Sequence, residues 1–361
     1  MTAARKRITQ QDIARMTGVS QATVSLVLNG RGDADVRIAP ETRERVLAAI
    51  RSTGYVADPI ARRLADRHNR ILGVFTYEPV FPAGSGDFYQ PFLLGIEESA
   101  EQLGCDLLLL TSAPVTDGRR RIFHEDNRLR LADGCILLGR SLDRDELTRL
   151  VAEGQAFVSV GRRDDAGGPV PHVGADYVTA TAAVVARAVA AGHRELCYLG
   201  DGGETSRSSG GTGGSVPESF ADRFAGYREA AARHGLAPRW EKASGRTPAE
   251  VLDALVADGV TAVLVEEFAD GVALAAVARE RGLDLPGDLS MLALGDPTRP
   301  APTDIDFSGY RIPRREMGRQ ATEVLTALIA GEVSRSDARR LLPCEPVAGV
   351  TLTAPNTRRN G

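Results

Sequence analysis

From residue 71 onward, the sequence alternates between short apolar runs and stretches with helical periodicity. The apolar runs are ILGVFTY, CDLLLLTS, GCILLG, AFVSVG, ELCYLGD, TAVLVEE and LSMLALGD. The helical stretches are QPFLLGIEESAEQLG, RDELTRLVAEG, VTATAAVVARAVAAGH, ADRFAGYREAAARHG, PAEVLDALVADG and GVALAAVARERG. Short, continuous apolar runs are typical of strands buried in a parallel sheet. Their alternation with helices predicts an α/β fold with parallel sheets, whose ligands bind at the carboxyl ends of the strands.

The length and composition narrow the class of protein further. A chain of 361 residues exceeds what one ordinary hydrophobic core encloses, so we expect two or three domains. No apolar run approaches the roughly 20 residues needed to span a bilayer, and no apolar segment follows the basic residues of MTAARKRITQ. We therefore expect a cytoplasmic protein with no membrane partner. The four cysteines lack metal or redox spacing, so we expect buried reduced thiols, no metal and no cofactor.

The charge is distributed unevenly along the chain. Residues 1–67 carry 12 Lys and Arg residues against 7 Asp and Glu residues, whereas the remainder carries 32 against 41. A basic N-terminal segment ahead of an acidic body is consistent with binding of a polyanion such as nucleic acid. The same distribution of charge would arise if these residues were ordinary solvent-exposed groups with no partner. Charge alone therefore does not establish binding of a polyanion, and the local motifs have to distinguish the two interpretations.

The segment ITQQDIARMTGVSQATVSLVLNG favours a helix-turn-helix. Thr9 and Asp12 have the spacing of a capping box, which begins a helix. Gly18 permits the left-handed backbone that ends this helix, and Ser20 caps a second one. Two short helices joined by such a turn form a helix-turn-helix. The side chains expected to pack between them are Ile13, Ala14, Met16, Val24, Val27 and Leu28.

The opposite face of the second helix begins with Gln21 and Ala22, which would reach base edges in the major groove. A glutamine amide can bond adenine in a bidentate manner, and an alanine methyl can contact the methyl group of thymine. Thr23 and Ser25 suit phosphate contacts, which position the helix without reading sequence. The alternative is a structural helical hairpin in a protein that does not bind DNA, and the basic charge of this segment argues against it.

A third helix is expected in PETRERVLAAIRSTG, because Pro40 suits a first helical position and Gly54 can end the helix. The following segment, DPIARRLADRHNR, has the pattern of one further short helix beginning at Pro59. That helix is too short to be stable in isolation, so by itself the segment is interpreted as a linker.

The ordered motifs DIARMTGVSQATVSLVLNG, PETRERVLAAIRSTGY and DPIARRLA resemble the LacI/GalR-type bacterial transcriptional regulators, and the resemblance extends along almost the whole chain. It implies a repressor at the nucleoid that binds double-stranded operator DNA as a homodimer on a near-palindromic site. Residues 59–65 would form a hinge helix that orders on DNA, with Leu64 entering the central base step from the minor groove. The residues expected to contact DNA are Thr9, Ser20, Gln21, Ala22, Thr23, Ser25, Leu26, Asn29, Ile60, Ala61 and Leu64.

The sequence departs from the family pattern at several places. Leu26 stands where the family often has an arginine and cannot hydrogen-bond guanine, which changes the expected operator half-site. The loop NGRGDADVRIAP is longer than usual, and Ala39 replaces a serine cap, with an expected loss of about 1 kcal/mol. The C-terminal LLPCEPVAGVTLTAPNTRRNG lacks the leucine heptad of tetrameric members. We therefore expect a dimer.

For the body, the resemblance implies a periplasmic-binding-protein-like fold of two doubly wound parallel-sheet subdomains with a ligand cleft between them. The expected domains are a helix-turn-helix head at 1–57, a hinge and linker at 58–70, an effector-binding and dimerisation domain at 71–345 and a tail at 346–361. The chain would cross between the subdomains near 174–178, 306–311 and 330–340.

The resemblance also implies that a small, sugar-like effector binds in this cleft. DFYQPFLLGIEE places Phe88 and Tyr89 at the cleft, where an aromatic face suits the apolar face of a sugar ring. Either ring could instead belong to the core. RFAGY places Arg223 at the effector, and a guanidinium fork suits sugar hydroxyls or a carboxylate. Asp143 and Asp176 are weaker matches that are more typical of surface or structural positions.

Two substitutions change the expected hydrogen-bonding set of the cleft. Glu267 and Phe268 replace a usual Asn-Asp pair, and Gly295 followed by Asp296 replaces a usual Asp. These differences predict either an unusual effector or none, so a ligand-independent repressor stays open, as does the choice between inducer and co-repressor. The enzyme alternative is disfavoured because the chain has no GxSxG, HExxH, P-loop or dinucleotide fingerprint.

Overall fold

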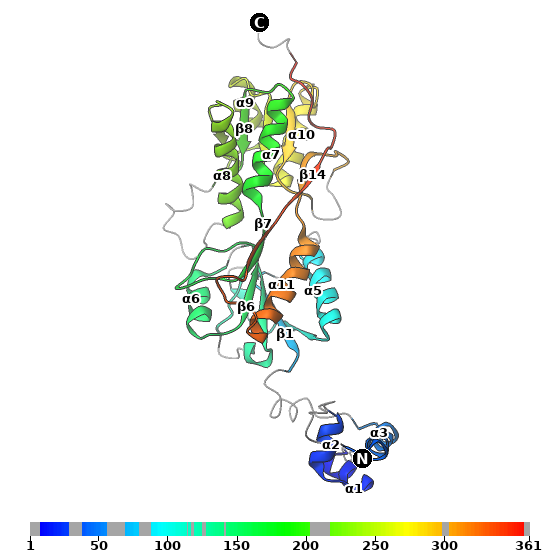
Figure 1. Cartoon of the computed structure of the whole chain (residues 1–361). Coiled ribbons are helices and arrows are strands. Elements are labelled where there is room, and N and C mark those ends of the chain that lie inside the picture. Colours follow the sequence, from blue (N-terminus) through cyan, green and yellow to red (C-terminus); the bar gives the residue numbers. More distant parts are fainter. Residues whose placement is uncertain are drawn as a thin grey trace. The chain divides into compact units, whose positions relative to one another are not determined.

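The computed structural model describes residues 8–28, 38–55, 69–78, 88–113, 115–116, 119–124, 128–140, 142–202, 217–297 and 303–356. The chain divides into two compact units, a head within Met1–Asn69 and a body within Arg70–Gly361 (Figure 1). Each unit has a hydrophobic core of its own. Within the described ranges, no helix is both long enough and apolar enough to cross a membrane.

The described part of the head consists of α1 (Gln10–Thr17), α2 (Gln21–Leu28) and α3 (Pro40–Thr53). Their shared core is built from buried aliphatic side chains of all three helices, and Leu28, Leu47 and Ile50 pack at its edge. The buried members are Ile13, Ala14, Val24, Val27 and Val46. The helix-turn-helix and the third helix are therefore present as predicted.

The ends of α1 confirm the predicted caps. The Asp12 N–H donates to Thr9 Oγ1 at 3.3 Å, and the Thr9 N–H donates to the Asp12 carboxylate at 2.9 Å. Gly18 ends the helix at φ 67°. The prediction for Met16 was wrong, since its side chain is 60% exposed. Thr17 takes the inward position in the last turn, where its hydroxyl donates to the Ile13 carbonyl at 2.7 Å.

The first subdomain of the body is built on a parallel sheet with the order β13-β7-β6-β5-β1-β2. The strands are β1 (Ile71–Thr76), β2 (Asp106–Leu110), β5 (Gly134–Leu138), β6 (Phe157–Val160), β7 (His172–Ala175) and β13 (Arg339–Leu342). Helices α5 (Gln90–Leu103) and α11 (Arg314–Ala330) cover one face, and α6 (Arg144–Ala152) covers the other. A short hairpin of β3 (Val115–Thr116) and β4 (Arg119–Arg120) and the 3-10 turn η1 (Leu129–Leu131) complete its described elements.

The second subdomain repeats this plan with the strand order β14-β12-β11-β10-β8-β9. The strands are β8 (Leu196–Leu199), β9 (Arg239–Glu241), β10 (Ala262–Val265), β11 (Ser290–Ala293), β12 (Ser308–Arg311) and β14 (Glu345–Val347), of which only β14 is antiparallel to its neighbour. Helices α7 (Tyr177–Ala190) and α8 (Glu218–Arg233) cover one face, and α9 (Pro248–Ala257) and α10 (Phe268–Glu280) cover the other. Alternating side chains of β10 enter the two cores, as period-2 strand geometry requires.

The chain passes between the subdomains at 175–177, 311–314 and 342–345 (Figure 1). The first crossing lies within the predicted 174–178. The other two lie further along the chain than 306–311 and 330–340, because β12 belongs to the second sheet and β13 extends the first. The RRLL sequence of β13 contains two arginines and lacks the apolar run that indicates a buried strand.

Close packing of helix pairs depends on glycines. A Cβ on Gly95 of α5 would lie 1.9 Å from the Arg315 carbonyl oxygen, and a Cβ on Gly318 of α11 would lie 2.1 Å from the Phe92 carbonyl oxygen. A Cβ on Gly226 of α8 would lie 2.4 Å from a carbonyl oxygen of α7. Both subdomains therefore carry a tightly packed helix pair on one face of a parallel sheet, which confirms the predicted doubly wound architecture.

Candidate ligand cavity and DNA-contacting helix

A cavity of about 250 Å³ lies where the carboxyl ends of the strands of both subdomains meet. Residues that follow β5 and β6 line it from the first subdomain, and residues that follow β10 and β11 line it from the second. The first residues of α8 and α11 also contribute to the lining. The cavity therefore occupies the position at which parallel α/β sheets bind ligands.

Aromatic rings line the cavity from both subdomains. Phe88 and Tyr89 precede α5, with ring centroids 5.0 Å apart in an edge-to-face arrangement. Tyr89 is buried and donates its hydroxyl hydrogen bond to Glu78, whereas Phe88 is only partly buried. Phe220 and Phe268 contribute from α8 and α10. Such flat apolar surfaces suit a ring-shaped ligand.

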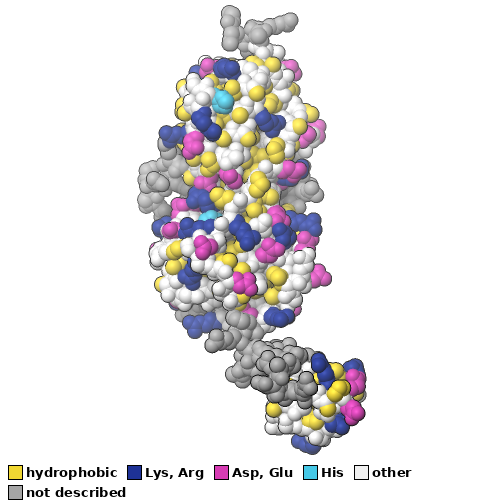
Figure 2. Space-filling model, in the orientation of Figure 1, with side chains coloured by type: hydrophobic (Ala, Val, Ile, Leu, Met, Phe, Trp, Pro, Cys, Tyr) yellow, Lys and Arg dark blue, Asp and Glu magenta, His cyan; other side chains and the backbone are white. Residues whose placement is uncertain are grey.

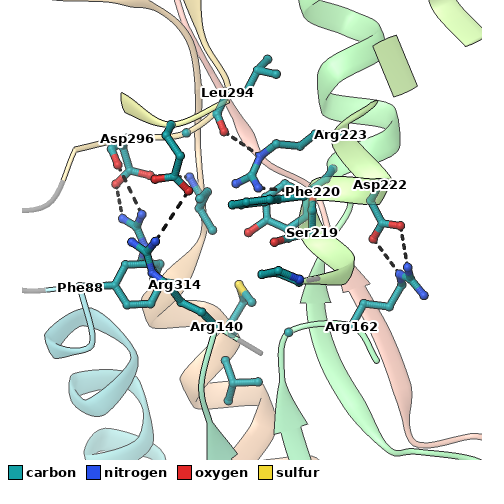
Figure 3. A pocket seen from close by; sticks show the side chains of 18 of the residues that line it. Phe88, Arg140, Arg162, Ser219, Phe220, Asp222, Arg223, Leu294, Asp296 and Arg314 are labelled. Carbon is teal, nitrogen blue, oxygen red and sulfur yellow. Dashed lines mark hydrogen bonds and ion pairs between the residues drawn. The ribbon is translucent and has the colours of Figure 1, made fainter. Parts of the chain in front are cut away.

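Arg223 of α8 is held rigidly in the wall of the cavity (Figure 3). Its Nε donates to the Leu294 carbonyl at 2.9 Å and to the Tyr310 hydroxyl at 3.1 Å, and its Nη1 donates to the Ser219 carbonyl at 3.3 Å. The guanidinium carbon lies 4.0 Å from the centre of the Tyr177 ring. The residue is only 6% exposed, so the direction of its guanidinium is set by the protein before any ligand binds.

Two ion pairs join the residues that directly follow β6 to helix α8, on one side of the cavity. Arg162 donates from Nε and Nη2 to the two carboxylate oxygens of Asp222, each at 2.7 Å. Arg163 donates from Nη1 to Glu218 at 3.1 Å and from Nη2 to the Gly139 carbonyl at 2.7 Å. Arg162 and Arg163 belong to the first subdomain and their carboxylate partners to the second, so these bonds close the cavity on one side.

Two further pairs lie on the opposite side of the cavity, beside Phe88 (Figure 3). Arg314 donates to the Asp296 carboxylate at 2.6 Å, and the Ile312 N–H donates to the other oxygen of that carboxylate at 2.9 Å. Arg140 lies 3.7 Å from Glu267, beyond hydrogen-bond distance. In this part of the cavity too, the arginines belong to the first subdomain and the carboxylates to the second.

Glu266 is a buried acid in the same cavity. Its carboxyl group accepts hydrogen bonds from the Tyr198 hydroxyl and, at 3.0 Å, from the Asp201 N–H. Burial raises the pKa of Glu266 to about 7, and the hydrogen bond from Tyr198 only partly offsets that effect. A group of this kind changes its charge near neutral pH.

In the head, the N-terminal turn of α2 exposes the residues that the sequence assigns to base contacts. Gln21 and Ala22 are exposed, and the Gln21 amide donates to the Gln10 side chain at 3.4 Å. Ser20 accepts the Thr23 N–H at 3.1 Å, which confirms the predicted cap. Thr23, Ser25 and Leu26 are partly exposed. Asn29, Ile60, Ala61 and Leu64 lie outside the described residues.

Comparison with protein families gives two matches. Residues 9–58 match the model of the lacI family of bacterial regulatory proteins, and residues 185–352 match that of the periplasmic binding protein-like domain. This chain belongs to the lacI family. The lacI-family match covers the helix-turn-helix, and the second match covers most of the second subdomain together with α11 and β13 of the first.

Individual relatives of this lacI-family protein agree with that assignment. The HTH-type transcriptional regulator AscG of Escherichia coli (strain K12) is 27% identical over 334 residues, which cover 90% of this chain and 92% of AscG. A structure of the transcriptional regulator CelR–cellobiose complex is 25% identical, with a TM-score of 0.57 over 96% of this chain and 100% of that one. The crystal structure of the Lac repressor dimer bound to operator and the anti-inducer ONPF has the same fold, with a TM-score of 0.70 at 21% identity over 97% and 100%. This lacI-family protein is therefore a DNA-binding transcriptional regulator and not an enzyme.

The structure brings most of the sequence-assigned cleft residues of this lacI-family protein together. Phe88, Tyr89, Arg223, Glu267 and Asp296 all line the cavity. In the lacI-family body, however, two further candidates require correction, because Asp143 and Asp176 do not line it.

Asp143 and Asp176 instead begin helices. Asp143 accepts the N–H groups of Asp145 and Glu146 at the start of α6 and pairs with Arg121. Asp176 accepts the Thr179 N–H at 3.0 Å at the start of α7. Carboxylates at helix N-termini satisfy backbone donors that otherwise have none. These roles account for both residues of the lacI-family chain without a ligand.

Sequence reasoning missed the arginines of the cavity, Arg140, Arg162, Arg163 and Arg314, and the buried Glu266. A signal for three of them was available. The sequences ILLGR and VSVGRR each place arginine directly after a Gly that ends a buried strand, and β5 and β6 are neighbours in the sheet. Since carboxyl ends of adjacent parallel strands meet at one edge, these arginines converge in the lacI-family cleft.

Proposed function

We propose that this lacI-family regulator is a repressor that binds a near-palindromic operator as a homodimer, and that a sugar-like ligand in the cavity controls it. Two relatives support this direction: one is a Lac repressor dimer bound to operator, and another is a regulator in complex with cellobiose. The observation that carries the proposal is the cavity itself, with aromatic and hydrogen-bonding side chains from both subdomains.

The ligand would act on the angle between the two subdomains. A molecule that contacts Arg223 in the second subdomain and Phe88 or Arg140 in the first binds one relative orientation of the subdomains better than others. A ligand shifts a conformational equilibrium only through such a difference in affinity. The resulting rotation would change the spacing of the two hinge segments in the dimer, and so the affinity for operator.

On the DNA side, the first residues of α2 would read base edges while the surrounding hydroxyl groups contact phosphate. Gln21 and Ala22 would contact bases, and Leu26 would make an apolar contact with them. The hinge residues Ile60, Ala61 and Leu64 would enter the minor groove, with Leu64 as the wedge. The phosphate-contacting set is Thr9, Ser20, Thr23, Ser25 and Asn29.

The homodimer would form through the open edge of the first subdomain. β2 is the last strand of its sheet, and Leu107 and Leu109 on it are 39% and 36% exposed. Leu94 on the neighbouring helix α5 is 42% exposed. An exposed edge strand with leucines is a surface that proteins normally cover by pairing.

The decisive experiment selects bound sequences from a random double-stranded DNA pool with the full chain, at fixed salt, because phosphate contacts depend on salt. We expect a near-palindrome. Leu64→Ala should lose specific affinity by about ten-fold or more, whereas Leu341→Ala, which removes an exposed leucine of β13, should bind as wild type does. Enrichment of no motif, or an unaltered Leu64→Ala, would contradict the proposal.

Ligand control is tested on the selected operator by titration with neutral and acidic sugars. Release or tightening of DNA by any of them supports control through the cavity. If none changes DNA affinity while the operator is still bound, the protein is a ligand-independent repressor.

A further inference from the structure

We propose that the ligand of the cavity carries an oxyanion, a carboxylate or a phosphate ester on a sugar-sized molecule, and that Arg140 and Arg223 bind this oxyanion from opposite subdomains. The inference rests on the proposed function, because it names the class of ligand for the same cavity. Four observations on the charges and hydrogen bonds of the cavity support it.

The first observation is the direction of the charges across the cavity. In each of the four pairs that join the subdomains among the described residues, the arginine belongs to the first subdomain and the carboxylate to the second. In the ligand-free protein, these carboxylates pair with the guanidinium groups of the first subdomain in the way that an anionic ligand would. On the face of the body shown in Figure 2, by contrast, basic and acidic side chains are interspersed. The described lining holds five arginines and four carboxyl groups, so an oxyanion that displaces one of these carboxylates meets a guanidinium already oriented to pair with it.

The second observation is that Arg140 is the least satisfied of these four arginines. Its side chain is 52% exposed, and its carboxylate partner, Glu267, is 41% exposed at 3.7 Å. The guanidinium lies 4.9 Å from the centre of the Phe88 ring, which directs it without using its N–H groups. A planar guanidinium whose N–H groups are not used by the protein can donate two parallel hydrogen bonds to a carboxylate or phosphate. An incoming oxyanion needs to displace only one weak, solvent-exposed contact.

The third observation concerns Arg223, which faces the cavity from the other subdomain. Its hydrogen bonds all go to uncharged acceptors, and no carboxylate oxygen of the described residues lies within ion-pair distance. Its Nη2 donates to none of the described residues. Glu266 interacts with Arg223 electrostatically but forms no ion pair with it. A buried guanidinium without a direct anionic partner is unfavourable, so an anion that contacts Arg223 would gain more than a neutral hydroxyl.

The fourth observation is the balance of donors and acceptors in the lining. Among the described lining residues, the buried side-chain atoms that lack a hydrogen-bond partner are both donors, the Nε groups of Arg163 and Arg314. None of the buried acceptors in that part of the lining lacks a partner. A lining with surplus donors complements a group that only accepts, as an ionised carboxylate or phosphate does.

Glu266 gives this proposal a distinctive pH dependence. The groups that face it are Tyr198 on β8, the Asp201 N–H after β8, Arg223 on α8 and Glu267 before α10. An oxyanion bound at Arg223 adds negative charge near Glu266 and therefore favours its protonated form. Because burial raises the pKa of Glu266 to about 7 in the ligand-free protein and a bound anion raises it further, binding takes up a proton above that value. Affinity for an anion therefore rises as pH falls toward about 7 and levels off below it.

The test measures binding by calorimetry to the full chain for matched sets of sugars: aldoses, their aldonic and uronic acids, and their phosphate esters. Acetate and inorganic phosphate serve as bare oxyanions. We expect an acid or a phosphate ester to bind about ten-fold or more tightly than its neutral parent. The sugar acids, whose own charge is constant in this range, should bind more tightly at about pH 6 than at pH 8. The carboxylate and phosphate arms distinguish the two sources of the oxyanion.

Variants separate a direct contact from a structural effect. Arg140→Met keeps the apolar stem and should weaken binding of the anionic ligand about ten-fold while changing a neutral sugar less than about two-fold. Arg121→Met is the matched control, because Arg121 is an exposed, ion-paired arginine of the same subdomain outside the cavity. Glu266→Gln should abolish the pH dependence of binding for the sugar acids, whose carboxylates stay ionised between about pH 6 and pH 8.

Two results would overturn the inference. A neutral sugar that binds as tightly as its acid and its phosphate ester, and that changes DNA affinity, would leave the proposed ligand control intact and refute the oxyanion. Equal effects of Arg140→Met and Arg121→Met would refute the role of Arg140. If no probe of either class bound, both the inference and the proposed ligand control would fail, whereas DNA selection would stand on its own.

Discussion

Arg162 and Asp222 connect the two subdomains through two hydrogen bonds, Nε to Oδ2 and Nη2 to Oδ1, each 2.7 Å long. Their side chains are 25% and 15% exposed, so solvent screens the pair only in part. Two parallel bonds between a guanidinium and a carboxylate fix both distance and orientation. This pair therefore restricts how far the subdomains can rotate when the cavity is empty.

Loss of the Arg162–Asp222 pair should loosen that restriction. Asp222→Asn preserves the shape of the side chain and should lower the free energy of unfolding of the body by about 1–3 kcal/mol. Denaturant unfolding of Asp222→Asn, Arg162→Met and the double variant measures the coupling between the two residues. A coupling energy indistinguishable from zero would show that the two side chains do not stabilise the closed arrangement.

Gly95→Ala should destabilise the first subdomain, although alanine is the better helix former. Its Cβ would lie 1.9 Å from the Arg315 carbonyl oxygen, so α5 and α11 would have to separate. We expect a loss of about 2 kcal/mol or more in denaturant unfolding. Glu97→Ala, at an exposed position of the same helix, should change stability by less than about 0.5 kcal/mol. A stabilised Gly95→Ala variant would contradict the close helix contact.

Glu266 should make stability depend on pH in the acid to neutral range. Its pKa is about 7 in the folded chain because of burial, against 4.5 for the ordinary group. Between these values the unfolded chain has released the proton that the folded chain still holds, so stability falls as pH rises through this window and levels off above it. The difference in unfolding free energy between wild type and Glu266→Gln should decrease by about 1–3 kcal/mol across the window. A constant difference would place the titration of Glu266 outside this range.

Ala39→Ser should stabilise the head. Ala39 occupies the N-cap position of α3 with φ −58° and ψ 135°, and no side chain caps this helix. A serine there would accept a backbone N–H of the first turn and contribute about 0.5–1 kcal/mol. Amide hydrogen exchange in α3 of the full chain measures this gain. Exchange as fast as in wild type would mean that the serine hydroxyl does not reach the backbone.

Local features of the sequence were sufficient for the head and for the alternation of helices and strands in the body, but not for a strand without an apolar run, such as β13. The capping box of Thr9 and Asp12, the left-handed Gly18 and the Ser20 cap depend on residues within a few positions of one another, and all are present. Apolar runs between helical stretches likewise indicated parallel strands, since each run carries its own signal. The strands formed by these runs are buried except for β2, an edge strand on which Leu107 and Leu109 are exposed. The side chain of Met16 was predicted to face inward, but Thr17 takes that position. Thr17 can be buried there because its hydroxyl donates to the Ile13 carbonyl within the same helix.

The sequence by itself determined the α/β alternation and the helix-turn-helix, and the family resemblance indicated Arg223 as a candidate ligand contact. Only the tertiary structure decided which charged residues meet across the cavity. Arg162 and Asp222 are 60 positions apart, and Arg140 and Glu267 are further apart still. Arg140 and Arg162 follow Gly residues at the ends of apolar runs, but no local feature indicates which carboxylates they meet. Their encounter depends on strand order and on crossings formed by β12 and β13, and such long-range pairing is a property of the folded chain rather than of any local segment.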